Sequence, residues 1–299
     1  KKKKKLFSVI SNPEFLREGE AIRDFRYPDR IVIGSDNKSE FKTMKKLYSP
    51  LISKGAKFFT TTRKGAELIK YASNAFLATK ITFINELANL CEKTGINVED
   101  ISLGIGSDSR IGSRFLRAGP AYGGSCFPKD TKGLVSAAEK YKTNLSIVKS
   151  VISSNHKRVN LLTERVHSIL GKNLKNKKIS ILGVTFKPNT DDMRDSTSLK
   201  MIPYYCKSGA KVSYYDPSGE KKEFKNIKNC TYKKNIKENC IDADLIILLT
   251  EWDEFKSIDF KKINKKKNLK IYDLRNLYSP EEMKKNKLQY YSVGRPNLN

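Results

Sequence analysis

The residues with the clearest chemical potential lie in the segment Tyr122-Gly-Gly-Ser-Cys126-Phe-Pro-Lys129-Asp130. Glycines let the backbone adopt unusual conformations, so the pair before Cys126 would present the thiol to a ligand. A nearby cation such as Lys129 favours the thiolate, which is the form that attacks carbonyl carbon. The alternative is a turn with a small apolar cysteine, because free cysteines are usually buried. On these nine residues alone, that second interpretation is favoured.

Two further pairs have a spacing of four residues. Glu14 and Glu18 would share a face if their segment is helical, and two carboxylates could then move protons or bind polar groups. Lys70 and Asn74 lie on an otherwise apolar helical pattern, and an ammonium beside an amide is a donor pair that stabilises an oxyanion. For the first pair alone, a solvated face with a helix-dipole interaction is the favoured interpretation. For the second, a lysine that reaches from an apolar surface to water is the commoner explanation.

Polar residues also follow two predicted strands. The segment 186–195 contains Lys187 and Arg194, which could hold phosphate oxygens, and 273–276 contains Arg275 in the equivalent position of a later strand. Arg110, Arg114 and Arg117 precede the cysteine segment and add cationic donors. Because ligands of parallel sheets bind beyond the carboxyl ends of the strands, these segments are expected to carry function.

The elements that must position these residues alternate between strands and helices, which predicts parallel sheets. The predicted strands are 6–10, 31–34, 56–60, 179–184, 211–215, 245–249 and 269–272, and the predicted helices are 38–54, 64–93, 97–105, 130–141, 145–170 and 198–208. The helix over 64–93 would span about 45 Å, long enough to bridge two domains. Neither a G-x-G-x-x-G fingerprint nor a Walker motif is present in these 299 residues.

Composition narrows the class of protein. The formal charge is +27, but the lysines are spread along the chain without interleaved aromatic residues, so a solvated surface is favoured over a nucleic-acid platform. Five cysteines without a C-x-x-C pair, together with only two histidines, argue against a disulfide framework or a metal centre and predict a reducing cytosol. No apolar run is long enough to span a membrane.

Seven segments in order along the chain resemble the nucleotide-sugar dehydrogenase family, which includes UDP-glucose, GDP-mannose and UDP-N-acetylmannosamine dehydrogenases. They are NPEFLREG (12–19), ELIKYASNAFLATKITFINEL (67–87), GSDSRIGSRFL (106–116), YGGSCFPKD (122–130), GVTFKPNTDDMRDS (183–196), TEWDEF (250–255) and DLRNLYSP (273–280). The resemblance covers nearly the whole chain. It implies an NAD-dependent, four-electron oxidation of the C6 alcohol of UDP-glucose to UDP-glucuronate, through a cysteine thiohemiacetal and thioester.

The resemblance also implies roles for single residues. Cys126 would be the nucleophile, Lys70 and Asn74 would stabilise the oxyanion, Asp130 would position water, and Glu14 would assist thioester hydrolysis. The implied substrate contacts are Phe15, Leu16, Glu18, Lys70, Asn74, Arg110, Phe115, Gly123, Phe186, Lys187 and Arg275. The implied cofactor contacts are Glu18, Lys129 and Arg194. Arg110 would reach the substrate of a neighbouring subunit, so a homodimer is implied.

The expected fold class is α/β, with three domains. Residues 1–62 would be the tail of an N-terminal Rossmann-like NAD-binding domain, 63–165 a central helical and dimerisation domain, and 166–299 a Rossmann-like UDP-sugar-binding domain with a parallel sheet. The family's glycine-rich dinucleotide fingerprint would lie upstream of Lys1, so this chain is expected to be a truncated form of a cytoplasmic enzyme. The alternatives are a sibling dehydrogenase for another nucleotide sugar and a non-catalytic remnant that binds nucleotide sugar or nucleic acid.

Overall fold

Two parallel strands and three short helices form the N-terminal part of the computed structural model, which describes residues 7–296. The elements are α1 (Ala21–Arg26), β1 (Arg30–Gly34), α2 (Lys38–Leu47), α3 (Ser49–Ile52) and β2 (Lys57–Thr61). Strands β1 and β2 pair in parallel, and Ile31, Ile33 and Ala56 form a small core with apolar residues of α2 and α3. This part is therefore a β-α-β unit, as expected for the tail of an α/β sheet.

Two predicted elements of this part are wrong. Residues 7–10 form no strand: Phe7 and Val9 are exposed, and only Ser11 makes an isolated antiparallel bridge to Gly34. Leu6, where that strand was expected to begin, lies outside the described residues. The helix expected over 38–54 is divided into α2 and α3, because Pro50 lacks an N–H and keeps the preceding backbone from continuing a helix.

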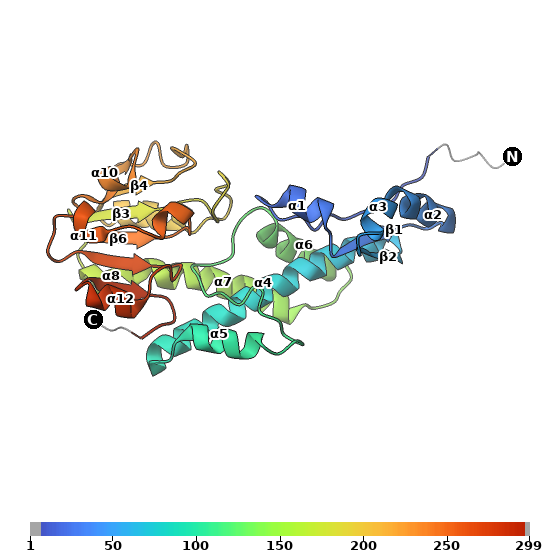
Figure 1. The fold of residues 1–299 in the computed structure, drawn as a ribbon, viewed down its shortest axis with the longest axis horizontal. Helices are drawn as coiled ribbons and strands as arrows, with labels where there is room; N and C mark the ends of the chain where they lie inside the picture. Colours follow the sequence, from blue (N-terminus) through green and yellow to red (C-terminus); the bar gives the residue numbers. More distant parts are fainter. Residues whose placement is uncertain (1–6, 297–299) are drawn as a thin grey trace.

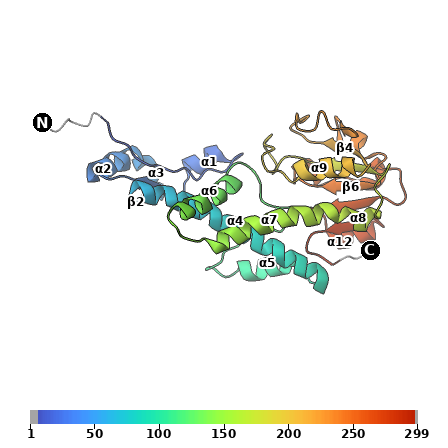
Figure 2. The same ribbon diagram turned by 180° about the vertical axis from the view of Figure 1, so that it is seen from behind.

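The middle of the molecule is built on one long helix. Helix α4 (Arg63–Thr94) begins at Thr62, whose hydroxyl accepts a hydrogen bond from the N–H of Gly65 at 3.1 Å, and ends at Gly95 in the left-handed conformation. The other helices of this part are α5 (Val98–Gly106), α6 (Phe127–Lys140), α7 (Ser146–Glu164) and α8 (Val166–Leu170). Figures 1 and 2 show α4 and α7 side by side along the length of the molecule.

The boundaries of two helices differ from their predictions. Helix α6 starts at Phe127 instead of 130, because Pro128 fits the first turn, where no N–H is needed. The helix expected over 145–170 is divided into α7 and α8 at Arg165.

The C-terminal part holds a six-stranded parallel sheet. Its elements are β3 (Lys178–Leu182), α9 (Ser198–Lys207), β4 (Lys211–Tyr215), β5 (Cys230–Tyr232), α10 (Ile236–Cys240), β6 (Leu245–Leu248), the 3-10 helix η1 (Asp253–Phe255), α11 (Phe260–Ile263), β7 (Lys270–Asp273), α12 (Pro280–Lys285) and β8 (Gln289–Ser292). The strand order is β5-β4-β3-β6-β7-β8. This is the doubly wound Rossmann order, in which the winding direction reverses between β3 and β6. The expected Rossmann-like sheet is thus confirmed.

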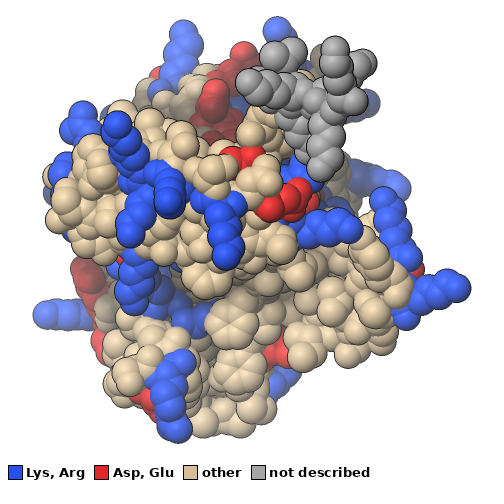
Figure 3. Space-filling model, turned by 90° about the vertical axis from the view of Figure 1, so that its right-hand side faces the viewer, with Lys and Arg blue, Asp and Glu red and all other residues tan. Residues whose placement is uncertain are grey.

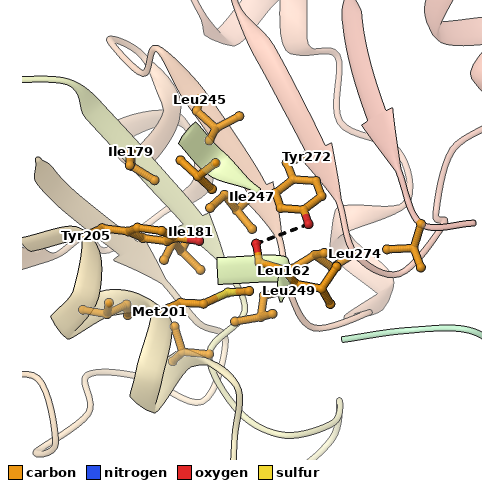
Figure 4. Close-up of a cluster of buried hydrophobic side chains, with 14 of the residues drawn as sticks. Leu162, Ile179, Ile181, Met201, Tyr205, Leu245, Ile247, Leu249, Tyr272 and Leu274 are labelled. Atoms are coloured by element: carbon orange, nitrogen blue, oxygen red, sulfur yellow. Dashed lines mark hydrogen bonds between the residues drawn. The ribbon is translucent and has the colours of Figure 1, made fainter. Parts of the chain in front are cut away.

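Both faces of this sheet are buried, which explains the continuous apolar runs of its strands. On one face, Ile181 and Ile247 pack against Leu162 of α7 and Met201 and Tyr205 of α9 (Figure 4). On the other face, Ile246, Leu248 and Ile271 pack against α10, α11 and α12. The C-terminal end of α7 therefore belongs to the core of the sheet and joins it to the helical middle.

All five cysteines are free thiols. No helix within residues 7–296 is long and apolar enough to cross a membrane. Figure 3 shows one end of the molecule, where Lys and Arg side chains stand at separate points with uncharged surface between them. Placement in the cytoplasm stays a prediction.

Candidate active site

Cys126 lies immediately before the first residue of α6, and its side chain is half-buried. The hydroxyl of Ser125 is 3.5 Å from the sulfur, and the carbonyl of Cys126 accepts a hydrogen bond from the N–H of Asp130 at 2.8 Å. The N-terminal end of a 14-residue helix carries a partial positive charge that stabilises an anion such as a thiolate. The cysteine is therefore presented at a helix end, and the core interpretation of this residue is wrong.

Helix α4 supplies the group that holds Asp130. The Nδ2 of Asn74 donates a hydrogen bond to Oδ2 of Asp130 at 2.6 Å, and both side chains are buried. Lys129 lies 3.7 Å from the other carboxylate oxygen, with its side chain in solvent. The carboxylate of Asp130 is thus fixed one helical turn from the sulfur.

Lys70 lies one turn before Asn74 on α4 and faces the N-terminal segment. Its Nζ forms an ion pair with Oε1 of Glu14 at 3.1 Å and stands 5.4 Å from the centre of the Phe15 ring. Glu14 also accepts a hydrogen bond from the N–H of Leu16 at 2.6 Å. The structure therefore brings Glu14, Phe15 and Lys70 together, as the sequence resemblance implies.

The shared helical face expected for Glu14 and Glu18 is absent, because residues 12–17 have no regular structure. Pro13 and the turn at Gly19, where φ is +81°, favour an extended segment. Glu14 faces Lys70 of α4, whereas the Glu18 carboxylate accepts a hydrogen bond from Thr190 at 2.5 Å. The Glu14 carboxylate therefore binds α4, whereas the Glu18 carboxylate binds the loop after β3.

Lys187 joins this N-terminal segment to the loop that follows β3, residues 183–196. Its Nζ donates to the carbonyl of Glu18 at 2.6 Å. Burial lowers the pKa of Lys187, and the negative charges of Glu18 and of a Cys126 thiolate oppose that shift. Lys187 therefore links the N-terminal segment to the 183–196 loop.

The glycine pair before Cys126 packs against the same 183–196 loop. A Cβ on Gly123 would lie 2.4 Å from the carbonyl oxygen of Asp195, and one on Gly124 would lie 2.7 Å from the ring of Phe186. Gly124 has a φ of +80°, and its N–H donates to the carbonyl of Arg194 at 2.7 Å. These glycines are needed for contact between two loops of the chain itself, in addition to any contact with a ligand.

Arg275 ties together the ends of three neighbouring strands. Its Nε donates to the carbonyl of Leu249 after β6 at 2.9 Å, and its Nη2 donates to the carbonyl of Phe186 after β3 at 3.0 Å. Nε also lies 2.9 Å from Oε2 of Glu251, and burial lowers the pKa of Arg275. The arginine stands at the place where the winding of the sheet reverses, which is where ligands of such sheets bind.

Two of the remaining predicted residues have exposed guanidinium groups, and the third lies beside the cysteine segment. The guanidinium of Arg110 is 87% exposed and pairs with Asp108, and that of Arg194 is 65% exposed and pairs with Asp192. Phe115 has a φ of 66° and its ring centre lies 6.2 Å from that of Phe127, beside the start of α6. Arg110 and Arg194 are therefore available to a ligand or to a second chain.

The sequence analysis missed residues that hold the site. Asn155 of α7 accepts from the N–H of Tyr122 and donates to its carbonyl, both at 3.0 Å, and so fixes the backbone that leads to the glycine pair. Thr190 and Glu251 lie inside segments that carry the family resemblance, so the resemblance could have identified them. Asn155 lies in an ordinary helical pattern, and only tertiary packing reveals its role.

Three family models match the chain. The NAD binding domain of the UDP-glucose/GDP-mannose dehydrogenase family matches residues 1–52, the central domain matches 64–157, and the UDP binding domain matches 180–280. The cysteine and the α4 residues thus fall in the central domain, and Lys187 and Arg275 fall in the UDP binding domain.

Individual proteins are similar over nearly the whole chain. A UDP-glucose 6-dehydrogenase of Rhizobium meliloti is 47% identical, over 97% of this chain and 67% of that protein. One of Rickettsia prowazekii is 48% identical, over 96% of this chain and 67% of that protein. The structure of a UDP-glucose dehydrogenase from Pyrobaculum islandicum superposes with a TM-score of 0.86 at 32% identity, covering 96% of this chain and 63% of that one. The chain thus spans about two thirds of the length of these relatives.

Proposed function

Because this chain belongs to the UDP-glucose/GDP-mannose dehydrogenase family, we propose that the whole protein oxidises UDP-glucose to UDP-glucuronate with NAD. The observation that carries the proposal is the thiol of Cys126 at the start of α6, with Asp130 held by Asn74 beside it. The glycine pair before Cys126 packs against the 183–196 loop, which follows β3 in the part of the chain that matches the UDP binding domain. No second function is favoured by a feature of this site.

Cys126 would keep the substrate bound between two oxidations. After the C6 alcohol has lost a hydride and a proton, the thiolate adds to the aldehyde carbon and the oxygen takes up a proton, which gives a thiohemiacetal. Loss of a second hydride and of the hydroxyl proton gives a thioester, and water then releases the acid and the thiol. NAD, when bound, would supply the hydride acceptor for both oxidations.

The residues around the sulfur have matching roles. In its neutral amine form Lys70 takes the alcohol proton in the first oxidation. As the ammonium, Lys70 donates a hydrogen bond with Asn74 to the oxygen on C6 when that oxygen becomes negative. Asp130 positions the water that attacks the thioester. Glu14, ion-paired with Lys70, assists that hydrolysis.

The substrate would lie between the N-terminal segment and the 183–196 loop. Lys187 and Arg275 provide cationic donors for its phosphates and uridine. The remaining proposed contacts are Phe15, Leu16, Glu18, Phe115, Gly123 and Phe186. Lys129, Arg194 and Glu18 would meet the cofactor, and the exposed guanidinium of Arg194 suits its anionic pyrophosphate.

The proposal includes a homodimer. Phe76, Phe83 and Leu90 follow one another at intervals of seven residues along α4 and are 67%, 52% and 57% exposed. On a helix this spacing makes one apolar stripe, which a second copy would cover. The exposed Arg110 would then reach the substrate of the neighbouring subunit.

The test is the stoichiometry of the whole protein. UDP-glucose with excess NAD should yield two NADH per sugar, and Cys126→Ser should abolish formation of the acid. A yield of one NADH per sugar, or full activity of Cys126→Ser, would contradict the mechanism. Measuring the oxidation of GDP-mannose and UDP-N-acetylmannosamine beside that of UDP-glucose identifies the preferred nucleotide sugar. A clear preference for either of the first two would assign the protein the activity of a sibling dehydrogenase.

A further inference from the structure

The loop that follows β3, residues 183–196, begins with two residues whose backbone is held by side chains from neighbouring strand ends. The N–H groups of Val184 and Thr185 donate to Oδ2 of Asp216, directly after β4, at 2.7 and 3.3 Å. The carbonyl of Thr185 accepts a hydrogen bond from the hydroxyl of Thr250, after β6, at 2.6 Å. The start of the loop is therefore fixed from the ends of β4 and β6.

Asp216 is fully buried, and its other oxygen belongs to a short chain of hydrogen bonds. Oδ1 accepts from the N–H of Ser218 at 2.9 Å and also from the Ser218 hydroxyl. That hydroxyl in turn accepts from Nζ of Lys221 at 2.7 Å, and Lys221 is also buried. Buried charges in proteins are normally paired. The Ser218 hydroxyl thus connects the ammonium of Lys221 with the carboxylate that holds the loop.

The same two positions bind the ligand directly in many sheets of this winding. In dinucleotide-binding sheets, the loop after the first strand lies against the pyrophosphate, and an acid after the second strand binds a ribose hydroxyl. Strands β3 and β4 are the corresponding strands in the order β5-β4-β3-β6-β7-β8. In this chain the loop N–H groups and the Asp216 carboxylate bind each other instead. Asp216 therefore acts on a ligand only through the loop.

We propose that Asp216, supported by Ser218 and Lys221, is a positioning residue for the UDP sugar. Phe186 and Lys187, which contact the substrate under the proposed function on which this inference rests, directly follow the two N–H groups that Asp216 holds. Without the carboxylate those N–H groups would turn toward water, because a buried N–H without a partner is unfavourable. Both substrate contacts would then be displaced, and UDP would bind more weakly.

Calorimetric titration of the intact protein with UDP tests this role. Asp216→Ala removes both acceptor oxygens and should raise the dissociation constant of UDP by about tenfold or more, with unchanged stoichiometry. The matched control is Asp242→Ala, which removes an exposed carboxylate from the same part of the chain and should leave the constant unchanged.

A purely structural role of Asp216 would give a different result. Fewer chains would be folded, so fewer UDP molecules would bind per chain, but the dissociation constant would stay the same. That outcome would overturn the positioning role and leave the proposed function intact. If the original protein does not bind UDP, the proposed function fails and the positioning role fails with it.

Ser218→Ala decides the question if Asp216→Ala does not fold. It keeps both oxygens of Asp216 and removes only the hydroxyl that links them to Lys221, so UDP should bind about threefold more weakly. An unchanged dissociation constant in Ser218→Ala, when Asp216→Ala does not fold, would refute the positioning role.

Hydrogen exchange shows where either variant loosens. The N–H groups of Val184 and Thr185 should exchange with solvent faster, by about threefold or more relative to those of β6, than in the original protein. An equal acceleration throughout the C-terminal part would mean that Asp216 supports the whole domain, and would overturn its role in positioning the loop.

Discussion

At the scale of single residues, Asp130 depends on one amide. It is buried beside the nucleophile, and Asn74 is its only buried donor among the side chains of the described residues. Asn74→Ala would leave that carboxylate unsatisfied and should lower the free energy of unfolding by about 1–3 kcal/mol. Urea unfolding measures the loss. The exposed Asn160→Ala should change stability by less than about 0.5 kcal/mol, and an equal effect of both variants would refute the buried bond.

Lys187 should give UDP binding a dependence on alkaline pH. Burial lowers its pKa below 10.5, so the ammonium loses its proton earlier than a lysine in solution. UDP affinity should therefore fall as pH rises through this lowered pKa. The free energy of unfolding of the free protein changes in the opposite direction. Between the lowered pKa and 10.5 the unfolded chain binds more protons than the folded one, so the free energy of unfolding rises with pH.

The dissociation constant of UDP between pH 7.5 and 10.5 measures this effect. Lys187→Arg keeps its charge over the whole range, whereas loss of the uracil N3 proton of UDP affects both proteins alike. The affinity of the original protein should therefore fall more steeply with pH than that of Lys187→Arg. A parallel loss in both proteins would exclude Lys187 as the titrating group.

The sequence predicts the chemistry of the site better than its geometry. The spacing of Lys70 and Asn74 on a helix indicates a donor pair, and the structure places both on α4 near the cysteine. The condition on which Glu14 and Glu18 would share a face, a helix, is not met, because Pro13 and Gly19 favour an extended segment. The roles of these residues in catalysis stay predictions.

At the scale of elements, the cysteine loop and the 183–196 loop are fitted to each other through the glycine pair. Gly124→Ala would place a methyl group 2.7 Å from the Phe186 ring at a φ of +80°. It should destabilise the protein by about 1–3 kcal/mol and weaken UDP binding, because the two loops must separate. Urea unfolding and UDP titration measure both effects.

The matched control is Gly104→Ala in α5. Nothing lies within 4 Å of a Cβ at this position, and its conformation is helical. The exchange should therefore stabilise the protein by up to about 1 kcal/mol. If Gly124→Ala were as well tolerated as Gly104→Ala, the proposed fit between the loops would be wrong.

Elements with a clear periodicity or a continuous apolar run were predicted, and several short elements with neither were not. Helix α4 and strands β1, β3 and β4 follow from periodicity and from apolar runs of adequate length. Strand β5 and the helices α10 and α11 have three to five residues each, too few for a periodic signal. They are stabilised by packing on the sheet, which local sequence does not encode.

At the scale of the whole molecule, the apolar stripe of α4 is the surface proposed to form the dimer. Phe83→Glu puts a charge at its centre and should raise the dissociation constant of the proposed dimer at least tenfold, which sedimentation equilibrium measures. Phe25→Glu, at a 56% exposed position of α1, serves as the control and should leave assembly unchanged. Persistence of the dimer in Phe83→Glu would place the interface elsewhere.

The sequence alone does not predict how the three parts of the molecule are placed relative to one another. The Glu92 carboxylate, in the last turn of α4, accepts a hydrogen bond from the N–H of Gly294 at 2.8 Å. The carbonyl of Gly294 in turn accepts one from the N–H of Val98, at the start of α5, at 2.7 Å. Gly294 lies about 200 residues after Glu92 and Val98, and no local pattern in the sequence links them.

The length of α4 has a mechanical consequence. Lys70 at one end and Glu92 at the other are separated by about 33 Å of helix at 1.5 Å per residue. A rigid rod of that length that tilts by about one degree moves its far end by about 0.6 Å, which already exceeds the tolerance of about 0.5 Å for catalytic groups. A movement of the C-terminal part that displaces Glu92 would therefore also displace Lys70 and its ion pair with Glu14.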